Sequence, residues 1–420
     1  MRGVMLRAAA AATVVTTLAG CGAATIRTPS QGGRWVELTS EHFVVWTDAN
    51  GDRARELIRE MERMRQIVVG VAFPTVPSSG KSQVIVLRND DELAALSLTG
   101  EPRAYAMSAQ PPLWQPMFVL PAFSNRGTGD STVAHELTHV ISFSVVRGQP
   151  RWLAEGMAEY FETVELDPNA TNADIGVAPL VGGQPMRMPH LIPVEKLLTW
   201  GRPSEGEQRE YSTAWALFTF LINEHRAELV RYMQAVDAWT DDQAPPGARA
   251  IRLWEAAFSS LPLSEVDDAL REWLVSGRHR VLHINIKLQP WPSTESLLGE
   301  ADVLALRGLL HAVMPGQDAA ARADVDAALA AEPTNVLARL LALLEAREPI
   351  TLEQAHAAAA AHPHDWRAWL MTVLALESAH GDAAELAAAR ARACALVALN
   401  AALAPPRGLC EPALASPPAP

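Results

Sequence analysis

The sequence predicts an α+β protein in which a domain of strands and helices, residues 35–280, precedes an all-helical part, residues 297–402. Short runs of alternating apolar residues, such as 42–47, predict strands in the first third of the chain. Segments with apolar residues at helical spacing first alternate with these strands and then replace them. After residue 297, Ala, Leu and Arg become frequent and strand-forming residues become rare. A chain of 420 residues is long enough for two domains.

Residues 1–21 have the pattern of a targeting segment rather than of a folded element. Arg2 and Arg7 accompany a short apolar run, which ends in an L-A-G-C sequence at Cys21. This pattern resembles the lipobox of bacterial lipoprotein precursors, which implies cleavage before Cys21 and acylation of that cysteine. The resemblance implies export and a lipid anchor in the cell envelope, and Gly22 in place of Asp favours the outer membrane. An ordinary cleavable signal with a chance cysteine is the alternative.

The remaining composition is that of an exported soluble body. The chain has 35 basic and 48 acidic residues, a formal net charge of −13, and such a surface repels nucleic acid, so no nucleic-acid partner is expected. Residues 22–34 are rich in Gly, Thr, Ser and Gln, which predicts a tether, and the Pro-rich residues 403–420 predict a disordered tail. Cys394 and Cys410 can pair in an oxidising compartment or remain two thiols, and the sequence leaves both open.

The first half of the 35–280 domain is expected to form a small sheet with accompanying helices. Alternating or continuous apolar runs predict its strands, whereas an amphipathic run and an acidic helix start predict its helices. The expected elements are strands at 35–39, 42–47, 82–87, 105–107 and 117–120, a long helix at 53–69 and a short helix that opens at Asp90.

The most informative stretch is His135-Glu136-Leu137-Thr138-His139, which reads H-E-x-x-H. On a helix, residues i and i+4 share a face, so His135 and His139 can place imidazole nitrogens on one metal ion. Zinc catalysis needs three protein ligands, a position for water, and a carboxylate that takes a proton from that water. Glu136 can be this general base, and Glu155 on the next predicted helix can supply the third ligand.

A solvated helix face that carries two histidines and a glutamate by chance is the other interpretation of this motif. The neighbouring residues disfavour it, because an apolar stripe beside the histidines indicates a helix packed on a core. Asp130-Ser131-Thr132 also predicts an N-cap just before the motif. The stripe consists of Val133, Ala134, Leu137, Val140 and Ile141.

With the segment P-R-W-L-A-E-G-M-A-E-Y at 150–160, the motif resembles the gluzincin zinc peptidases, most closely the peptidase MA-like branch. The resemblance implies a zincin-like metalloprotease domain with a small N-terminal sheet, an active-site helix and a helical lower half. It implies one Zn²⁺ per chain, with Glu155 as third ligand and Glu159 as the group that orients a ligand histidine. It also implies that strand 117–120 forms the rim of the cleft, where an extended substrate can pair.

The resemblance is specific only over residues 130–162, and two features of other zinc peptidases are missing from the sequence. We find no counterpart of the G-x-M-E-N segment of the aminopeptidases, so their specificity does not carry over. Ser142 and Val145 stand where the metzincin motif requires Gly and His.

Tyr211 is the second candidate catalytic residue. It lies at the start of the predicted helix 209–224, which packs near the site in relatives, so its hydroxyl can donate a hydrogen bond to the oxyanion. A capping or half-buried tyrosine is an equally open alternative. His190 lies in segment 165–192, which is expected to be irregular and near the cleft, and is interpreted as a surface residue. Further helices are expected at 227–239, 248–258 and 264–276.

The all-helical part contains a repeated pattern. Residues 332–341 and 362–371 share a Pro-x-(Asn/Asp) step before an apolar helix, which resembles degenerate tetratricopeptide helix pairs. Such pairs can form a groove for a protein partner, whereas an Ala-rich bundle without a groove is the alternative. His356, His362 and His364 lack the carboxylate or Cys neighbours of a metal site and are interpreted as surface residues.

These observations predict a zinc-dependent peptidase anchored to the cell envelope, with a peptide or protein as substrate. Zinc held by His135, His139 and Glu155 would activate a water, while Glu136 would take its proton and return it to the leaving amine. Two alternatives stay open. One is a catalytically silent zincin-fold lipoprotein that acts as an envelope binding or assembly scaffold. The other is a zinc hydrolase that cleaves a different amide, such as one in the cell wall.

Overall fold

The computed structural model describes residues 26–73, 80–96, 104–122, 129–167, 169–177, 180–181, 184–185, 191–201, 207–239, 246–345, 349–400, 402–406 and 408–410. The predictions for the signal segment with Cys21, for residues 22–25, for His190 and for residues 411–420 lie outside this part of the chain. Within it, no helix is long and apolar enough to cross a membrane.

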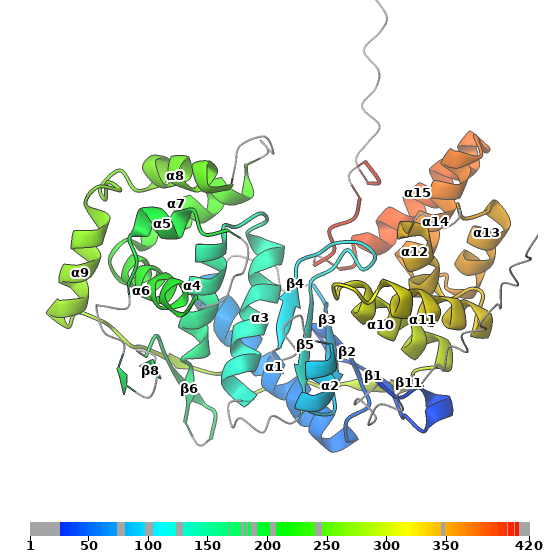
Figure 1. The fold of residues 1–420 in the computed structure, drawn as a ribbon, viewed down its shortest axis with the longest axis horizontal. Coiled ribbons are helices and arrows are strands. Elements are labelled where there is room, and N and C mark those ends of the chain that lie inside the picture. Colours follow the sequence, from blue (N-terminus) through cyan, green and yellow to red (C-terminus); the bar gives the residue numbers. More distant parts are fainter. Residues whose placement is uncertain are drawn as a thin grey trace, which may run out of the picture.

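A six-stranded mixed sheet lies at the centre of the molecule, in the order β11-β1-β2-β3-β5-β4 (Figure 1). Strands β2, β3 and β5 run parallel to one another, and the other three pairings are antiparallel. The strands are β1 (Val36–Thr39), β2 (Phe43–Thr47), β3 (Ser82–Leu87), β4 (Tyr105–Met107), β5 (Met117–Pro121) and β11 (Thr294–Leu297). The first five confirm the predicted strands.

One predicted role in this sheet is wrong. Residues 117–120 were expected at the rim of the cleft, but β5 is an interior strand that pairs with β3 on one side and with β4 on the other. The short strand β4 is the edge of the sheet in the described part of the chain. The sequence of the runs 105–107 and 117–120 is compatible with either of them at the edge of the sheet, so only the observed pairing shows which strand is interior.

Both faces of the sheet are covered, which explains why all six residues of β3 are buried. Val84 and Val86 belong to a core shared with helices α1 (Gly51–Ala72) and α3 (Gly129–Val145). Ile85 and Leu87 point the other way, into a core shared with α10 (Glu300–Ala312) and α11 (Asp318–Ala331). Because successive side chains of a strand alternate between faces, a continuous apolar run is what a doubly covered strand requires.

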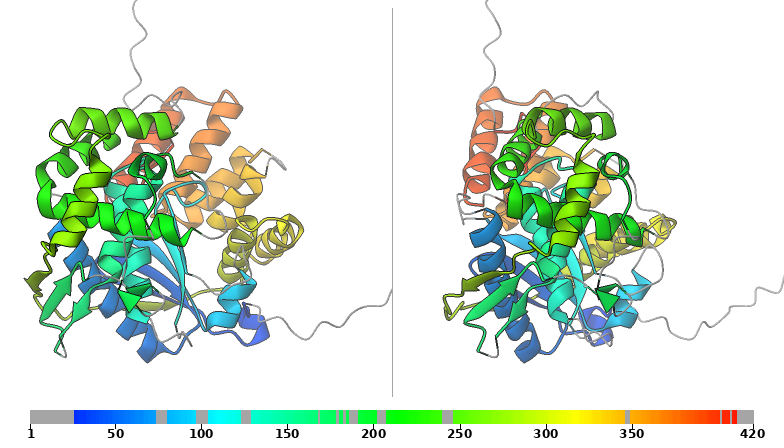
Figure 2. Two further views of the ribbon diagram at one scale, coloured as in Figure 1. Left: turned by 60° about the vertical axis from the view of Figure 1, so that its left-hand side comes forward. Right: turned by 90° about the vertical axis from the view of Figure 1, so that its left-hand side faces the viewer.

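The helices divide between the two sides of the sheet, and Figures 1 and 2 show α4 to α9 gathered beyond α3, and α10 to α15 on the opposite side. Beside α1 and α3, the first group contains α4 (Arg151–Glu162), α5 (Val194–Leu198), α6 (Gln208–Glu224), α7 (Arg226–Asp237), α8 (Pro246–Ala257) and α9 (Val266–Ser276). The second group adds α12 (Val336–Leu344), α13 (Leu352–Ala361), α14 (Trp366–Ser378) and α15 (Ala383–Val397). The short α2 (Asp90–Ala95) follows β3 and confirms the helix expected at Asp90.

The segment expected to be irregular, 165–192, is partly a small sheet. Strand β7 (Asn172–Ile175) pairs with β6 (Glu165–Leu166) on one side and with β10 (Leu282–Asn285) on the other. Two further short strands, β8 (Leu180–Val181) and β9 (Gln184–Pro185), form a separate pair. The first domain therefore extends past the predicted end at residue 280, because β10 returns to it.

The all-helical part is confirmed as helical from Glu300, but it is not an independent unit. Its helices α10 and α11 complete the core on the second face of the sheet, and β11, just before them, pairs with β1. The repeated Pro-x-(Asn/Asp) step is the turn inside each helix pair. Asn335 accepts from the Ala338 amide to cap α12, and Asp365 accepts from the Arg367 amide to cap α14.

Two segments that were predicted to be unstructured are packed. Ile26 is buried among α10 residues, and its carbonyl accepts from Arg307 Nη1 at 3.2 Å. Ser30, in the short 3₁₀ helix Pro29–Gln31, bonds to the Glu300 carboxylate through both its amide and its hydroxyl. The tether prediction is therefore wrong for residues 26–34, where contacts with a distant part of the chain outweigh the flexible composition.

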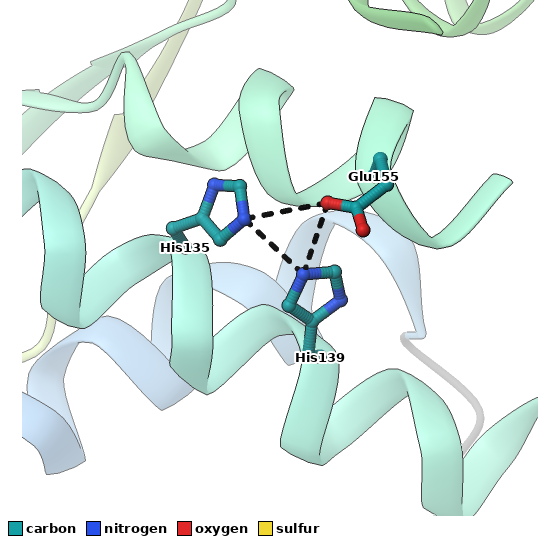
Figure 3. Close-up of side chains that lie close together, drawn as sticks. All are labelled: His135, His139 and Glu155. Carbon is teal, nitrogen blue, oxygen red and sulfur yellow. Dashed lines mark hydrogen bonds and ion pairs between the residues drawn. The ribbon is translucent and has the colours of Figure 1, made fainter. Parts of the chain in front are cut away.

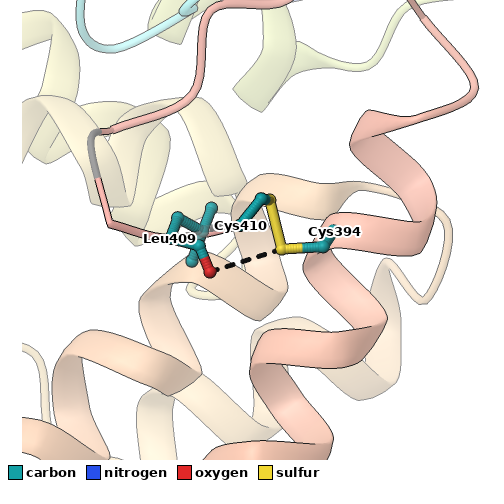
Figure 4. Close-up of a disulfide and its surroundings, with 3 residues drawn as sticks. All are labelled: Cys394, Leu409 and Cys410. Carbon is teal, nitrogen blue, oxygen red and sulfur yellow. Dashed lines mark hydrogen bonds between the residues drawn. A yellow bond between two sulfur atoms is a disulfide. The ribbon is translucent and has the colours of Figure 1, made fainter. Parts of the chain in front are cut away.

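The predicted disordered tail is likewise packed over its described residues, 403–406 and 408–410. Cys394 and Cys410 form a disulfide, and the Cys394 sulfur lies 3.4 Å from the Leu409 carbonyl oxygen (Figure 4). The Ala404 amide donates to the Trp114 carbonyl at 2.7 Å. These described residues are thus fastened to α15 and to the loop between β4 and β5.

Candidate metal centre

Helix α3 presents His135 and His139 one turn apart, and α4 packs across it with Glu155 facing both rings (Figure 3). The two Nε2 atoms lie 3.2 Å apart. The Glu155 Oε2 atom lies 3.5 Å from the first and 3.4 Å from the second. The structure thus brings together the three residues that the sequence analysis assigns as ligands, and each offers one donor atom to a common point.

The spacing of these three donor atoms fits a zinc ion. Zinc in proteins is four-coordinate and tetrahedral, with nitrogen and oxygen ligands at about 2.0–2.1 Å, so neighbouring donors stand about 3.3–3.4 Å apart. The three observed separations, 3.2, 3.4 and 3.5 Å, match this edge length. A pair of imidazoles and one carboxylate is also a donor set that zinc enzymes use, with the fourth position left for water.

The second ring nitrogen of His135 has a carboxylate partner, which fixes the ring. Its Nδ1 lies 2.8 Å from Glu162 Oε2, at the end of α4. Because a carboxylate accepts, Nδ1 carries a proton in this contact, so a neutral His135 would have its lone pair on Nε2, the nitrogen on the side of the donor cluster. The resemblance assigned this role to Glu159. In the structure the partner of Nδ1 is Glu162, one turn further along the helix. Glu159 lies in the same cluster as His135 and Glu162, so its assigned role stays a prediction.

The charges around the cluster interact strongly. Burial alone would lower the pKa of His135, but its contacts with Glu155 and Glu162 raise it well above the ordinary value. Burial alone would raise the pKa of Glu155, but hydrogen bonds from the two imidazoles hold it well below its usual range. Glu155 is therefore an anion between two rings, the charge state that a metal ligand needs.

The pKa values of Glu136 and Glu159 shift in the opposite direction to that of Glu155, because burial outweighs the attraction of the histidines. Glu136 is only 8% exposed, and burial raises its pKa despite the opposing influence of the two imidazoles. Burial raises the pKa of Glu159 to about 7. A raised carboxylate pKa lies closer to neutral pH, which suits a group that both accepts and returns a proton.

A glycine allows α4 to pack closely against α6. Gly156 follows Glu155 and faces α6, where a Cβ atom would lie 2.5 Å from the Ala214 carbonyl oxygen and 3.0 Å from Phe218 Cβ. Only a residue without a side chain permits this separation. The glycine after Glu155 in the sequence is thus explained by the crossing of α4 and α6.

Tyr211, in the first turn of α6, is connected to this cluster by Arg151, which contacts both Tyr211 and Glu155. Arg151 Nη2 donates to the Tyr211 hydroxyl at 3.2 Å, and Arg151 Nε lies 3.6 Å from Glu155 Oε1. Burial and the charge of Glu155 raise the pKa of Tyr211, so the phenol keeps its proton at neutral pH. Both interpretations of Tyr211 remain compatible with this position.

Sequence reasoning missed four residues around the centre: Glu162, Arg151, Glu207 and Trp200. Helical spacing could have found two of them, because Arg151 and Glu162 lie four residues before and seven after Glu155, on the same face of α4. The other two come from the segment between α5 and α6 and carry no spacing signal. No protein-family model matches this chain, and the search for similar curated proteins returned no match.

Proposed function

We propose that this protein is a zinc-dependent peptidase of the gluzincin type, whose first domain, with its sheet and the helices α1 to α9, has a zincin-like fold. One observation carries the proposal. The donor atoms of His135, His139 and Glu155 converge at 3.2–3.5 Å from one another, and the carboxylate Glu136 follows the first ligand. Two imidazoles, a carboxylate ligand and a further buried carboxylate form the set that metal-assisted hydrolysis needs.

The proposed mechanism divides the work among the residues of this chain. A bound zinc ion would supply Lewis acidity toward the substrate carbonyl and toward a water molecule. Glu136 would accept a proton from this water and pass it to the leaving amine. Tyr211 would donate a hydrogen bond to the carbonyl oxygen as negative charge develops there. Glu162 would keep the ligand nitrogen of His135 directed at the ion through its contact with Nδ1.

The edge strand β4 supports a peptide substrate. It packs against α3, the helix that carries both histidines, and in the described part of the chain its outer edge pairs with no other strand. An extended peptide can add to such an edge through backbone hydrogen bonds, which suit many sequences. We therefore assign the substrate-pairing role to β4 in place of β5.

The proposed location is the cell envelope, through a lipid on Cys21. The disulfide between Cys394 and Cys410 supports an oxidising compartment, because disulfides persist in exported proteins and are rare in the cytosol. We propose that the helix pairs of the all-helical part offer a surface to a protein partner.

The test compares the wild-type protein lacking residues 1–21 with the variants Glu136→Gln and Glu353→Gln, using casein as an unfolded substrate. Glu353 is an exposed residue of α13, so its variant controls for the loss of a carboxylate. We expect zinc-dependent cleavage by the wild type and the control, and none by Glu136→Gln with its zinc retained. Cleavage by Glu136→Gln would disprove the base assignment. A wild type with zinc but no cleavage of casein would favour the scaffold or a different amide.

A further inference from the structure

A partly buried guanidinium lies beside the proposed metal centre and has no part in the mechanism above. Arg151 is the first residue of α4, and its side chain is 13% exposed. Both of its Nη atoms donate to the Glu207 carboxylate, at 3.0 and 2.7 Å. Nη1 also donates to the Gly201 carbonyl at 3.3 Å. This two-pronged contact is the strongest form of a guanidinium–carboxylate pair and fixes its plane.

The face of the same guanidinium is covered by an aromatic ring. Arg151 Cζ lies 3.9 Å from the centre of the Trp200 ring. Trp200 Nε1 donates in turn to Glu207 Oε1 at 3.0 Å, so the ring and the carboxylate hold each other. A long side chain loses considerable rotamer freedom when it is held this way. Arg151 is thus clamped by residues that neither bind the metal nor act in the proposed catalysis.

The clamped guanidinium also lies within ion-pair distance of the Glu155 carboxylate. Glu155 Oε2 lies 3.5 and 3.4 Å from the two Nε2 atoms, whereas its other oxygen, Oε1, lies 3.6 Å from Arg151 Nε. The cation therefore attracts one oxygen while the second remains directed at the metal position. This arrangement favours a carboxylate that offers a single oxygen as ligand and leaves the fourth position of the site open.

The same guanidinium is hydrogen-bonded to the hydroxyl of Tyr211. Arg151 has only donors, so in its 3.2 Å contact with Tyr211 the phenol oxygen must accept. The phenol proton is then left for another acceptor. Trp200 packs edge-on against the Tyr211 ring, with centroids 5.1 Å apart, and limits its position further.

We propose that Arg151, clamped by Glu207 and Trp200, is a positioning residue that couples the metal ligand Glu155 to the hydroxyl of Tyr211. The inference rests on the proposed function and deepens it, because it connects ligand geometry with hydrogen-bond donation to the substrate. Neither the motif nor the resemblance assigns a role to these three residues.

The test uses Arg151→Lys, which keeps the charge but loses the planar fork and the stacking on Trp200. Glu207→Gln weakens the clamp without touching Arg151 and serves as a second variant. Arg147→Lys is the matched control, because the Arg147 side chain is 72% exposed and pairs with Asp237, which is no part of the clamp or of the ligand set. Zinc affinity is measured by competition with a chelator, and kcat and KM are measured on casein for Arg151→Lys, Tyr211→Phe and the double variant.

We expect Arg151→Lys to weaken zinc binding by about 10- to 100-fold, as removal of a group that orients a ligand does. Tyr211→Phe alone should lower kcat by about 100-fold with little change in KM. In a protein that already carries Arg151→Lys, the same substitution should lower kcat by a much smaller factor. Circular dichroism checks that each variant is folded. Unchanged zinc affinity in both Arg151→Lys and Glu207→Gln would overturn the proposal, and so would independent, multiplicative effects on kcat.

This design separates the inference from the proposed function. If the wild type binds zinc but does not cleave casein, the peptidase proposal fails, while the zinc affinities alone decide whether Arg151 positions Glu155. If the wild type cleaves and the Arg151 variants behave like Arg147→Lys, the peptidase proposal stands and the positioning role is refuted.

Discussion

Replacement of Gly156 by Ala tests how closely the proposed metal centre depends on the packing of α4 against α6. The added Cβ would lie 2.5 Å from the Ala214 carbonyl oxygen, whereas ordinary contact begins at 3.4 Å. Relative to α6, helix α4 would therefore have to shift by up to about 0.9 Å, which is the difference between these two distances. The neighbouring residue, Glu155, would move with it, and a metal site tolerates deviations of only about 0.2 Å in its ligand distances.

Two effects are expected from this movement. Overpacking should lower the free energy of unfolding by about 1–3 kcal/mol, measured by urea denaturation of the metal-free protein. Displacement of Glu155 should weaken zinc binding by at least about 10-fold, measured by competition with a chelator.

Gly70→Ala is the matched control for this prediction, because Gly70 is an exposed residue of α1 with nothing within 4 Å of the added atom. The control should be more stable than the wild type by about 0.5–1 kcal/mol, the difference in helix propensity. Its zinc affinity should be unchanged. A Gly156→Ala protein that binds zinc as tightly as the wild type would refute the reasoning that ties this glycine to the ligand geometry.

Three further predictions address other parts of the molecule. Glu162→Gln should weaken zinc binding about 10-fold or more, and Glu159→Gln should weaken it less; the opposite order in chelator competition would restore the original assignment. Burial and Glu92 raise the pKa of Asp48 to about 6, so its charge costs stability as pH rises from about 4 to 6. Between pH 4 and 7, the free energy of unfolding of Asp48→Asn should therefore rise relative to that of the wild type by roughly 3 kcal/mol at most. A difference between the two proteins that stays constant with pH in urea denaturation would contradict this. Cys394→Ser should lower the free energy of unfolding by about 3 kcal/mol, as expected for a loop of this length, and equal stability of variant and wild type would argue against the disulfide.

The elements of the fold were largely predictable, because their patterns are local. The run 82–87 indicated a buried strand, and 53–69 indicated a helix, from the spacing of their apolar residues alone. The packing between elements was not predictable in the same way. The apolar stripes of α10 and α11 would look the same in a free bundle as on the second face of the sheet. Residues 26–34 have the composition of a tether, and their order depends in part on contacts with α10, far along the chain.

In the candidate site, too, the residues set by a local pattern were predictable and those set by packing were not. His135, Glu136 and His139 follow from helical spacing, and Glu155 follows from its place on the next helix. The choice between Glu159 and Glu162 depends on the angle at which α4 crosses α3, which no local pattern specifies. The clamp on Arg151 depends on the segment that carries Trp200 and Glu207, whose conformation is set by tertiary contacts.

The most direct test of the central claim is the zinc content of the protein. Mass spectrometry would be applied to the form lacking residues 1–21, purified without chelator, and to the variants His139→Ala and His356→Ala. His356 pairs with Glu385 in the all-helical part and controls for the loss of a histidine. The account predicts one zinc ion per chain in the wild type and in His356→Ala, and loss of zinc in His139→Ala. Wild-type protein without zinc, or with zinc that His139→Ala retains in full, would contradict it.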